Sequence, residues 1–304
     1  MATLVFGHKN PDTDSITSTL VMTDLQTKLG HDVMACRLGD VNKETQYILN
    51  HFQIEAPKLI DAVTENDEVI LVDHNEFNQS ADGIEKARIK MVVDHHRLAN
   101  FQTSEPLFYR AEPVGCTGTI LYKMYKENGI EIEPTMAGLM ASAIISDSLL
   151  FKSPTCTPED EKACRELAEI AGLDVEVYGL EMLKAGTDLS DYSAEQLLGI
   201  DSKVFPMGTS TVEIAQINTV SIEDMMTRKA ELEEQMKAII AQKGLNLFVA
   251  VITDILNSNS QVITLGDRTD IVEKAFNVEL VDNTALLAGV VSRKKQIVPF
   301  MDRN

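Results

Sequence analysis

The chain has 304 residues, 44% of them hydrophobic, and this length and composition favour a folded protein with two domains over a disordered chain. Its 47 acidic residues outnumber its 27 basic residues, which gives a formal net charge of −20 at pH 7. Because this charge repels a phosphate backbone over most of the surface, we expect no extended binding to nucleic acid.

The chain begins with MATLVFGHKNPD, which has a short apolar run and no basic start, so a secretion signal is not expected. No stretch of the sequence is apolar for long enough to span a bilayer, so no membrane segment is expected either. The 4 cysteines are widely spaced without a C-x-x-C motif, and free buried thiols are the favoured interpretation. Together these features predict a cytoplasmic protein.

Strands and helices alternate in the first half of the chain. Short apolar segments at 3–6, 32–38, 67–73 and 89–94 are predicted as strands, and the segments ITSTLVMTDLQTKLG and NKETQYILNHF as helices. Strands that alternate with helices indicate right-handed crossovers and a parallel sheet. We therefore predict an open parallel sheet with helices on both faces.

The second half of the chain contains further predicted elements. One helix is expected from Thr157 to Gly172, and a long one from Ser221 to Lys243. Strand-like segments are predicted at 211–220, before the long helix, and at 247–256 and 261–266 after it, with a further helix at 270–277. The stretch before them is polar and rich in turn residues, which indicates a linker. The predicted division is a domain at 1–188, a linker at 189–194, and a smaller α/β domain at 195–304.

The first candidate site is the loop HKNPDTDS, which follows the first predicted strand. It carries His8, Asp12 and Asp14, and Pro11 stiffens the turn between them. Open parallel sheets bind ligands at this carboxyl edge, above all where the strand order reverses. By itself the loop also has a structural interpretation, because Asn-Pro-Asp is a common turn and Asp14 or Ser15 would suit a helix cap.

Two further predicted strands end in the same kinds of residue. One ends in Asp73, and the next ends in Asp94, which His95 and His96 follow. Because unpaired carboxylates are costly to desolvate, such strand ends indicate a shared partner, and one pair of divalent metal ions accounts for all of them. Carboxylate and imidazole without thiolate favour Mn²⁺, Co²⁺ or Fe²⁺. Two such ions, roughly 3.5–4 Å apart and bridged by a carboxylate, form an apparatus for in-line attack at phosphorus.

These motifs resemble the family II, manganese-dependent inorganic pyrophosphatases of the DHH phosphoesterase superfamily. The matching stretches occur in family order: GHKNPDTDS, VDHNEFNQS, VVDHHR, EPVGCTGTI, ISDSLLFKSPT and VSRKKQIVP. The resemblance implies a two-domain α/β enzyme with its active site in the cleft between the domains. The implied activity is that of an inorganic diphosphatase, which hydrolyses diphosphate to two phosphates through a metal-bridged hydroxide. The family also suggests a homodimer through the N-terminal domain.

The resemblance further implies which residues hold the metals. One metal would be held by His8, Asp12 and Asp73, and the other by Asp14, Asp73, His95 and Asp147, so that Asp73 bridges them. The implied cofactors are two tightly bound Mn²⁺ ions, with Co²⁺ as an alternative, and Mg²⁺ that enters with the substrate. Asp73 and His96 would be catalytic, His96 by contacting the substrate and protonating the leaving phosphate. Asp94 would orient neighbouring groups without binding metal.

A basic run near the C-terminus supplies the candidate substrate-binding residues. Arg293, Lys294 and Lys295 follow one another in an otherwise acidic chain, and apolar segments flank them on both sides. Although a charge run is usually a solvated turn, an arginine fork beside lysine charges matches a phosphate. The resemblance implies that Arg293 and Lys294 bind the electrophilic phosphate together with Lys203.

Two alternatives remain open at this point. The chain could be another DHH phosphoesterase, such as an exopolyphosphatase or a phosphodiesterase for small oligonucleotides or cyclic dinucleotides, since these share the metal cradle. The nuclease-type relatives among them carry a glycine-rich GGGH-like motif near the C-terminus, where this chain has SRKKQIVP. The chain could also be a metal-dependent sensor without activity. However, it has no room for a regulatory insert between Asp73 and Asp147, and no expected ligand or cation is missing.

Overall fold

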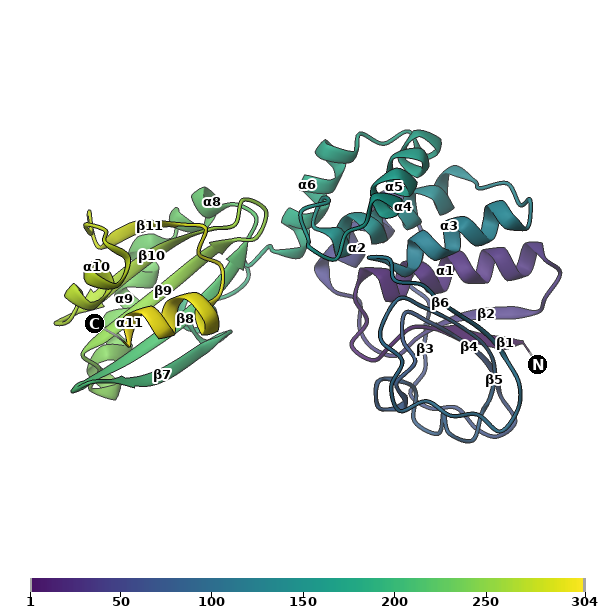
Figure 1. The fold of residues 1–304 in the computed structure, drawn as a ribbon, viewed down its shortest axis with the longest axis horizontal. Coiled ribbons are helices and arrows are strands. Elements are labelled where there is room, and N and C mark those ends of the chain that lie inside the picture. Colours follow the sequence, from purple (N-terminus) through teal and green to yellow (C-terminus); the bar gives the residue numbers. More distant parts are fainter. Residues whose placement is uncertain (1, 303–304) are drawn as a thin grey trace. The chain divides into compact units, whose positions relative to one another are not determined.

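The structure is a computed structural model that describes residues 2–302, with the backbone alone for Lys294 and Lys295. The chain divides into two compact units, Met1–Gly186 and Thr187–Asn304, each built around its own sheet (Figure 1). Among the described residues, no helix is both long and apolar enough to cross a bilayer.

Unit 1 is built on a six-stranded sheet in the order β3-β2-β1-β4-β5-β6, and all of its strand pairs are parallel. From β1 the chain moves outward to β2 and β3, and then returns to place β4 on the other side of β1. The strand order therefore reverses between β1 and β4, where open sheets of this kind bind their ligands. The strands are β1 (Thr3–Phe6), β2 (Val33–Arg37), β3 (Lys58–Leu59), β4 (Glu68–Val72), β5 (Arg88–Asp94) and β6 (Phe108–Ala111).

The helices of unit 1 lie together on one face of its sheet (Figure 1). They are α1 (Thr13–Lys28), α2 (Lys43–His51), α3 (Thr117–Glu127), α4 (Pro134–Ser148), α5 (Pro158–Ala171) and α6 (Val175–Gly186). On the other face, Phe6 and Leu71 pack under irregular segments and the short 3₁₀ helix η1 (Phe77–Gln79). The two-domain α/β class is as predicted, but the prediction of helices on both faces is wrong for this sheet. The connection after β4 is rich in Asn, Ser, Asp and Gly, which favour turns over a helix.

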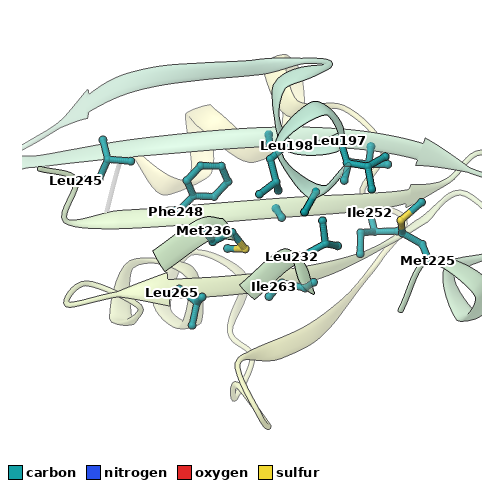
Figure 2. Packing of buried hydrophobic residues seen from close by; sticks show 14 residues of the cluster. Leu197, Leu198, Met225, Leu232, Met236, Leu245, Phe248, Ile252, Ile263 and Leu265 are labelled. Atoms are coloured by element: carbon teal, nitrogen blue, oxygen red, sulfur yellow. The ribbon is translucent and has the colours of Figure 1, made fainter. Parts of the chain in front are cut away.

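Unit 2 contains a five-stranded mixed sheet in the order β11-β10-β9-β8-β7, in which only β8 and β9 pair in parallel among the described strands. Its strands are β7 (Ser202–Met207), β8 (Ser210–Thr219), β9 (Leu247–Asp254), β10 (Asn259–Gly266) and β11 (Thr284–Ala288). On one face, Phe248 and Ile252 pack against Leu197 and Met236 from the helices (Figure 2). The helices on this face are α7 (Ala194–Gly199), α8 (Ile222–Met226) and α9 (Lys229–Lys243), and the elements on the other face are α10 (Asp270–Phe276), η2 (Arg293–Ile297) and α11 (Val298–Met301).

The single helix predicted from Ser221 to Lys243 is two helices, α8 and α9. The break falls at Arg228, whose backbone leaves the helical region with ψ of 7°. Just before it, the Thr227 hydroxyl donates to the Asp224 carbonyl at 2.6 Å, and the Arg228 guanidinium donates to the carbonyl oxygens of Leu189 and Tyr192. These tertiary bonds outweigh the helical preference of the sequence, which shows no glycine or proline at the break.

Candidate metal centre

The candidate ligands gather at the carboxyl edge of the sheet in unit 1, around the point where the strand order reverses. His8 follows the end of β1 after one glycine, Asp73 directly follows β4, and His95 directly follows β5. Because β1, β4 and β5 are neighbours and run in parallel, their carboxyl ends meet at one edge.

The first group of donors consists of His8, Asp12 and Asp73. The Nε2 atom of His8 lies 3.4 Å from Asp12 Oδ2 and 3.4 Å from Asp73 Oδ2. Asp12 is also the N-cap of α1, because its Oδ1 accepts from the Ser15 amide at 2.9 Å. The cap therefore falls two residues before Asp14, and it fixes Asp12 in place while the Oδ2 atom faces His8.

The second group of donors surrounds His95. Its Nε2 atom lies 3.3 Å from Asp73 Oδ1, 3.7 Å from Asp147 Oδ2 and 3.9 Å from Asp14 Oδ2. Asp147 comes from α4, which is remote in sequence from the strand ends. Asp73 thus directs Oδ2 to the first group and Oδ1 to the second. All the residues predicted as metal ligands are brought together, in two groups that share one carboxylate.

Both histidines present Nε2 to the carboxylates because their other ring nitrogen is occupied. The Nδ1 of His8 bonds the Lys9 carbonyl at 2.8 Å, and the Nδ1 of His95 bonds the Val114 carbonyl at 3.2 Å. A carbonyl only accepts, so each Nδ1 carries the proton and donates it. In the neutral imidazole Nε2 then keeps its lone pair, which is the arrangement found in metal-ligating histidines.

The N-terminus of α3 orients two of the carboxylates, and no single-residue signal in the sequence pointed to it. The Thr117 amide donates to Asp14 Oδ2 at 2.7 Å, and the Thr117 hydroxyl donates to Asp73 Oδ1 at 3.2 Å. The hydroxyl of Ser18 holds the other oxygen of Asp14 at 2.6 Å. These residues belong to the stretch EPVGCTGTI, which matched the family as a whole. Helix N-termini favour anionic partners, which would have been a usable signal.

Asp73 occupies an uncommon backbone conformation, with φ of 59°. Aspartate adopts this left-handed region more readily than most residues, and such conformations gather at functional sites. The conformation turns the chain immediately after β4, while the Asp73 amide still donates to the Val93 carbonyl at 3.0 Å. Asp73 is therefore held by the sheet through its backbone and turned toward both histidines through its side chain.

The acidic groups raise the pKa of both histidines. Burial lowers the pKa of His8, but hydrogen bonds with Asp12 and Asp73 outweigh it and raise the value to about 11. Burial likewise lowers the pKa of His95, and Asp73 together with the charge of Asp14 raises it to about 9. In the metal-free protein both rings are therefore imidazolium ions at neutral pH, and their positive charges offset the negative charges of the surrounding carboxylates.

The carboxyl groups show the complementary pattern. Burial and the charge of Asp73 raise the pKa of Asp14 to about 7, and burial with the neighbouring carboxylates raises that of Asp147 well above its ordinary range. Burial also acts to raise the pKa of Asp73, but both imidazolium ions hold it below the usual range. Its Oδ2 is buried and makes no hydrogen bond to any described residue. Protonated groups crowded among buried carboxylates, with Asp73 Oδ2 facing His8 Nε2 at 3.4 Å and making no hydrogen bond within the described residues, are the arrangement expected of a donor set for divalent cations, which would replace those protons.

Asp94 lies behind this cluster, fully buried, and positions His96. Its Oδ1 accepts from the His96 amide at 3.0 Å and from His96 Nδ1 at 2.9 Å, while Oδ2 accepts from the Asn75 side chain at 2.6 Å. The pKa of His96 is raised, chiefly by its hydrogen bond with Asp94. The His96 side chain is 53% exposed, whereas that of His95 is 14% exposed, so His96 is the histidine of this pair that a solvent-borne molecule can reach.

Replacing Asp94 by asparagine is expected to lower the pKa of His96 to the ordinary value of about 6.5 or below. The reason is that a neutral amide no longer stabilises the imidazolium form. An NMR titration of the His96 ring in the metal-free variant measures this directly. An unchanged pKa would show that Asp94 does not act on His96 through its charge.

Unit 2 carries the predicted substrate-binding cations. Arg293 opens η2, and its side chain is only 10% exposed, because the guanidinium bonds the Asp201 carbonyl and, at 2.5 Å, Asp201 Oδ1. It also donates to the Ile214 carbonyl at 3.4 Å, and Ile214 is the register partner of Lys203. Arg293 and Lys203 therefore both lie beside Ile214 of β8 in unit 2. The predicted role of Lys294 falls on a side chain outside the described residues.

Comparisons with known proteins agree on the family. The N-terminal domain model of the DHH family matches residues 2–144, and the DHHA2 domain model matches residues 180–304. The manganese-dependent inorganic pyrophosphatase of Bacillus subtilis is 59% identical over 299 residues, which cover 98% of this chain and 97% of that protein. An Exiguobacterium protein named "Probable manganese-dependent inorganic pyrophosphatase" is 63% identical, with 98% and 97% coverage. The chain belongs to the family II inorganic pyrophosphatases.

Solved structures of other proteins share the fold of this chain. A Methanococcus jannaschii protein titled "putative family II inorganic pyrophosphatase" matches with a TM-score of 0.64 and 38% identity, over 100% of this chain and 99% of that one. An exopolyphosphatase-related protein from Bacteroides fragilis, 13% identical with a TM-score of 0.53 over 99% of this chain and 91% of its own, shares the fold alone. The family resemblance and the two-domain α/β class predicted for this family II member are thus confirmed.

Proposed function

We propose that this chain hydrolyses inorganic diphosphate to two phosphates, using two divalent metal ions that share Asp73. The observation that carries the proposal is the geometry of Asp73, whose oxygens face two different imidazoles at 3.3 and 3.4 Å. Relatives at about 60% identity over nearly the full chain bear the name of this activity.

The donor set supports Mn²⁺ as the resident metal, since mixed carboxylate and imidazole donors suit it and the relatives are named for manganese. His8, Asp12 and Asp73 would hold one ion, and Asp14, Asp73, His95 and Asp147 the other. When bound, such a pair supplies Lewis-acid stabilisation of phosphate charge and lowers the pKa of water. Co²⁺ would fit the same donors, and Mg²⁺ would enter with the substrate, because it prefers oxygen ligands.

The protein side chains would hold protons and charges around the substrate. His96 is half exposed and carries a raised pKa, so it can contact the substrate and give a proton to the leaving phosphate. Asp94 keeps this ring oriented through Nδ1, which leaves Nε2 free to meet the substrate. Asp73 is ionised in the metal-free protein, because both histidine rings lower its pKa, and bound cations would keep it ionised in their place.

Arg293, Lys294 and Lys203 would bind the phosphate that is attacked, because a guanidinium fork and ammonium charges neutralise it in the transition state. Arg293 is now engaged with Asp201. A phosphate would therefore compete with the Asp201 carboxylate for the guanidinium, and the dianionic ligand would be favoured over a single carboxylate.

Phosphate release from diphosphate by the Mn²⁺-loaded protein tests the proposal. Short polyphosphate and a dinucleotide serve as comparison substrates, because the alternative DHH phosphoesterases act on such molecules. We expect rapid release from diphosphate and little from the others. Absence of release by protein that contains its full complement of Mn²⁺ would show that the chain is a binding protein instead.

Binding of Mn²⁺ is expected to release protons at pH 7.5 and to strengthen as the pH rises toward 9. The metal must displace the proton of His95, whose pKa is about 9 in the metal-free protein, and protons shared among the buried carboxyls, including that of Asp14 at about 7. A lower pH keeps these groups protonated and opposes binding. Calorimetric titrations in buffers of different ionisation enthalpy count the protons, and zero release would contradict the assignment of His95 as a ligand.

We further propose a cytoplasmic homodimer that associates through the N-terminal domain, and the domain limits 1–188 and 195–304 with a linker at 189–194. Free cysteines at 36, 116, 156 and 164 are compatible with a reducing compartment. Analytical ultracentrifugation of the full chain and of a fragment ending in the linker tests the association, since a monomeric full chain would contradict it.

A further inference from the structure

Glu44 lies in the first turn of α2, among polar groups that belong to two other segments of unit 1. One of its oxygens, Oε1, accepts from the Thr13 hydroxyl at 2.6 Å and from the Ser146 hydroxyl at 2.5 Å. The Thr13 hydroxyl also lies 3.2 Å from that of Thr45, the residue after Glu44. The first turn of α2 is thus hydrogen-bonded to both the beginning of α1 and the end of α4 through one side chain.

The two hydroxyl donors occupy special places in the sequence. Thr13 stands between Asp12 and Asp14, and Ser146 directly precedes Asp147. Glu44 Oε1 therefore joins two segments that carry candidate ligands. One is the start of α1, with Asp12 of the first donor group and Asp14 of the second, and the other is the end of α4, with Asp147. A shift of Glu44 would act on three candidate ligands together, although Glu44 touches none of the donor atoms described above.

Glu44 also contacts the last residue of unit 1. Gly186 ends α6, and the division between the units follows it. A Cβ atom added to Gly186 would lie 2.8 Å from Glu44 Cβ and 2.8 Å from Glu44 Oε2. Contacts below 3.0 Å do not occur for real Cβ atoms, so the glycine allows Glu44 to lie directly against the point where the chain leaves unit 1.

We propose that Glu44 is a positioning residue. It holds the segments that carry the two groups of donors in their relative positions and connects them to the end of α6. The inference rests on the proposed function, since it concerns the ligands of that site. Groups that orient metal ligands affect metal affinity by about 10- to 100-fold when they are removed. Glu44 acts on the segments through two hydroxyls, and a movement of the chain at Gly186 would reach the ligands by the same route.

The test compares Glu44→Ala, Glu44→Gln and Tyr47→Phe in the full chain. The glutamine variant keeps a carbonyl oxygen that accepts from both hydroxyls. Tyr47→Phe is the matched control, because the Tyr47 hydroxyl joins α2 to Glu181 of α6 at 2.9 Å without reaching a ligand segment. The readouts are Mn²⁺ affinity by calorimetry, the EPR signal of the exchange-coupled Mn²⁺ pair, and the melting temperature of the metal-free protein.

We expect Glu44→Ala to lower Mn²⁺ affinity by about 10- to 100-fold and to weaken the coupled EPR signal. Glu44→Gln is expected to retain both, and Tyr47→Phe to leave both unchanged. Unchanged affinity in Glu44→Ala would overturn the inference, as would a loss that Tyr47→Phe reproduces. If wild-type protein failed to bind Mn²⁺, the proposed function would fail instead.

Gly186→Ala tests the second half of the inference. The added methyl group should displace Glu44 and weaken Mn²⁺ binding, and this effect should be smaller when Glu44 is already alanine, because only the contact with its Cβ atom then remains. A double-mutant cycle on Mn²⁺ affinity measures the coupling between the two sites. Additive effects of Gly186→Ala and Glu44→Ala would overturn the link to the end of α6.

Discussion

Replacing Asp73 by asparagine is expected to abolish diphosphate hydrolysis and to weaken both metal sites at once. The substitution removes the negative charge that both donor groups share and leaves His8 and His95 facing an amide. Because removal of a mere orienting group costs about 10- to 100-fold in metal affinity, loss of a shared ligand should exceed about 100-fold. Calorimetric titration with Mn²⁺ and steady-state phosphate release measure the two effects.

Asp82→Asn provides the matched control for this experiment. Asp82 is an exposed carboxylate of the same unit that pairs with Lys9 at 2.6 Å, and its loss should leave metal affinity and turnover unchanged. The decisive comparison is between the two metal sites of Asp73→Asn. If only one of them weakened, Asp73 would belong to one site, and the shared position inferred from its geometry would be incorrect.

Replacing Arg293 by alanine is expected to reduce turnover of diphosphate by about 100- to 1000-fold while both Mn²⁺ ions stay bound. Arg293 is a cation of unit 2, whereas all the candidate metal ligands lie in unit 1. Its loss should therefore remove transition-state stabilisation of the phosphate without disturbing the metals. Metal content by elemental analysis, together with kcat and KM, separates these outcomes.

Arg268→Ala controls for the structural bonds that Arg293 makes within unit 2. Arg268 pairs with Asp270 at 2.9 Å and donates to the Ser210 hydroxyl, so its bonds within unit 2 involve other partners than those of Arg293. We expect little change in kcat for this variant. Loss of Mn²⁺ from Arg293→Ala would contradict the assignment of metals and substrate cations to different units.

Much of the candidate site follows from the sequence because it lies at strand ends. A buried strand is easily recognised, and the residues after it are forced to the carboxyl edge of a parallel sheet. His8, Asp73 and His95 could therefore be placed from local sequence together with one rule of topology. Asp147 could not, because it depends on how α4 packs against α1 and α3, and only the resemblance to the family indicated it.

The groups that orient the ligands were beyond sequence reasoning for a similar reason. Thr117 and Glu44 are ordinary helix-initial residues, and their roles depend on side-chain hydrogen bonds between segments far apart in the chain. The engagement of Arg293 by Asp201 was likewise invisible, since these residues are distant in sequence. Local patterns report burial and turns well, but they do not report which polar groups meet.

The errors in the fold have the same origin. The helical pattern from 221 to 243 is continuous in sequence, yet bonds from Arg228 to the chain near Leu189 divide it. The helices expected on the second face of the sheet in unit 1 are replaced by turn-rich connections, which an alternating pattern of strands and helices does not reveal. In both cases tertiary contacts decide between local structures of similar stability.

The donors that Asp73 joins are spread along the chain from His8 to Asp147, so an unfolded chain would hold them far apart. Metal ions would therefore bind folded unit 1 in strong preference to its unfolded form, and at about 1,000 times the dissociation constant this adds about 4 kcal/mol to its stability. Unit 2 contributes none of these donors and gains nothing directly. A cell that runs short of metal would thus lose molecules of this protein to unfolding and degradation, beginning with unit 1, as well as losing catalytic rate.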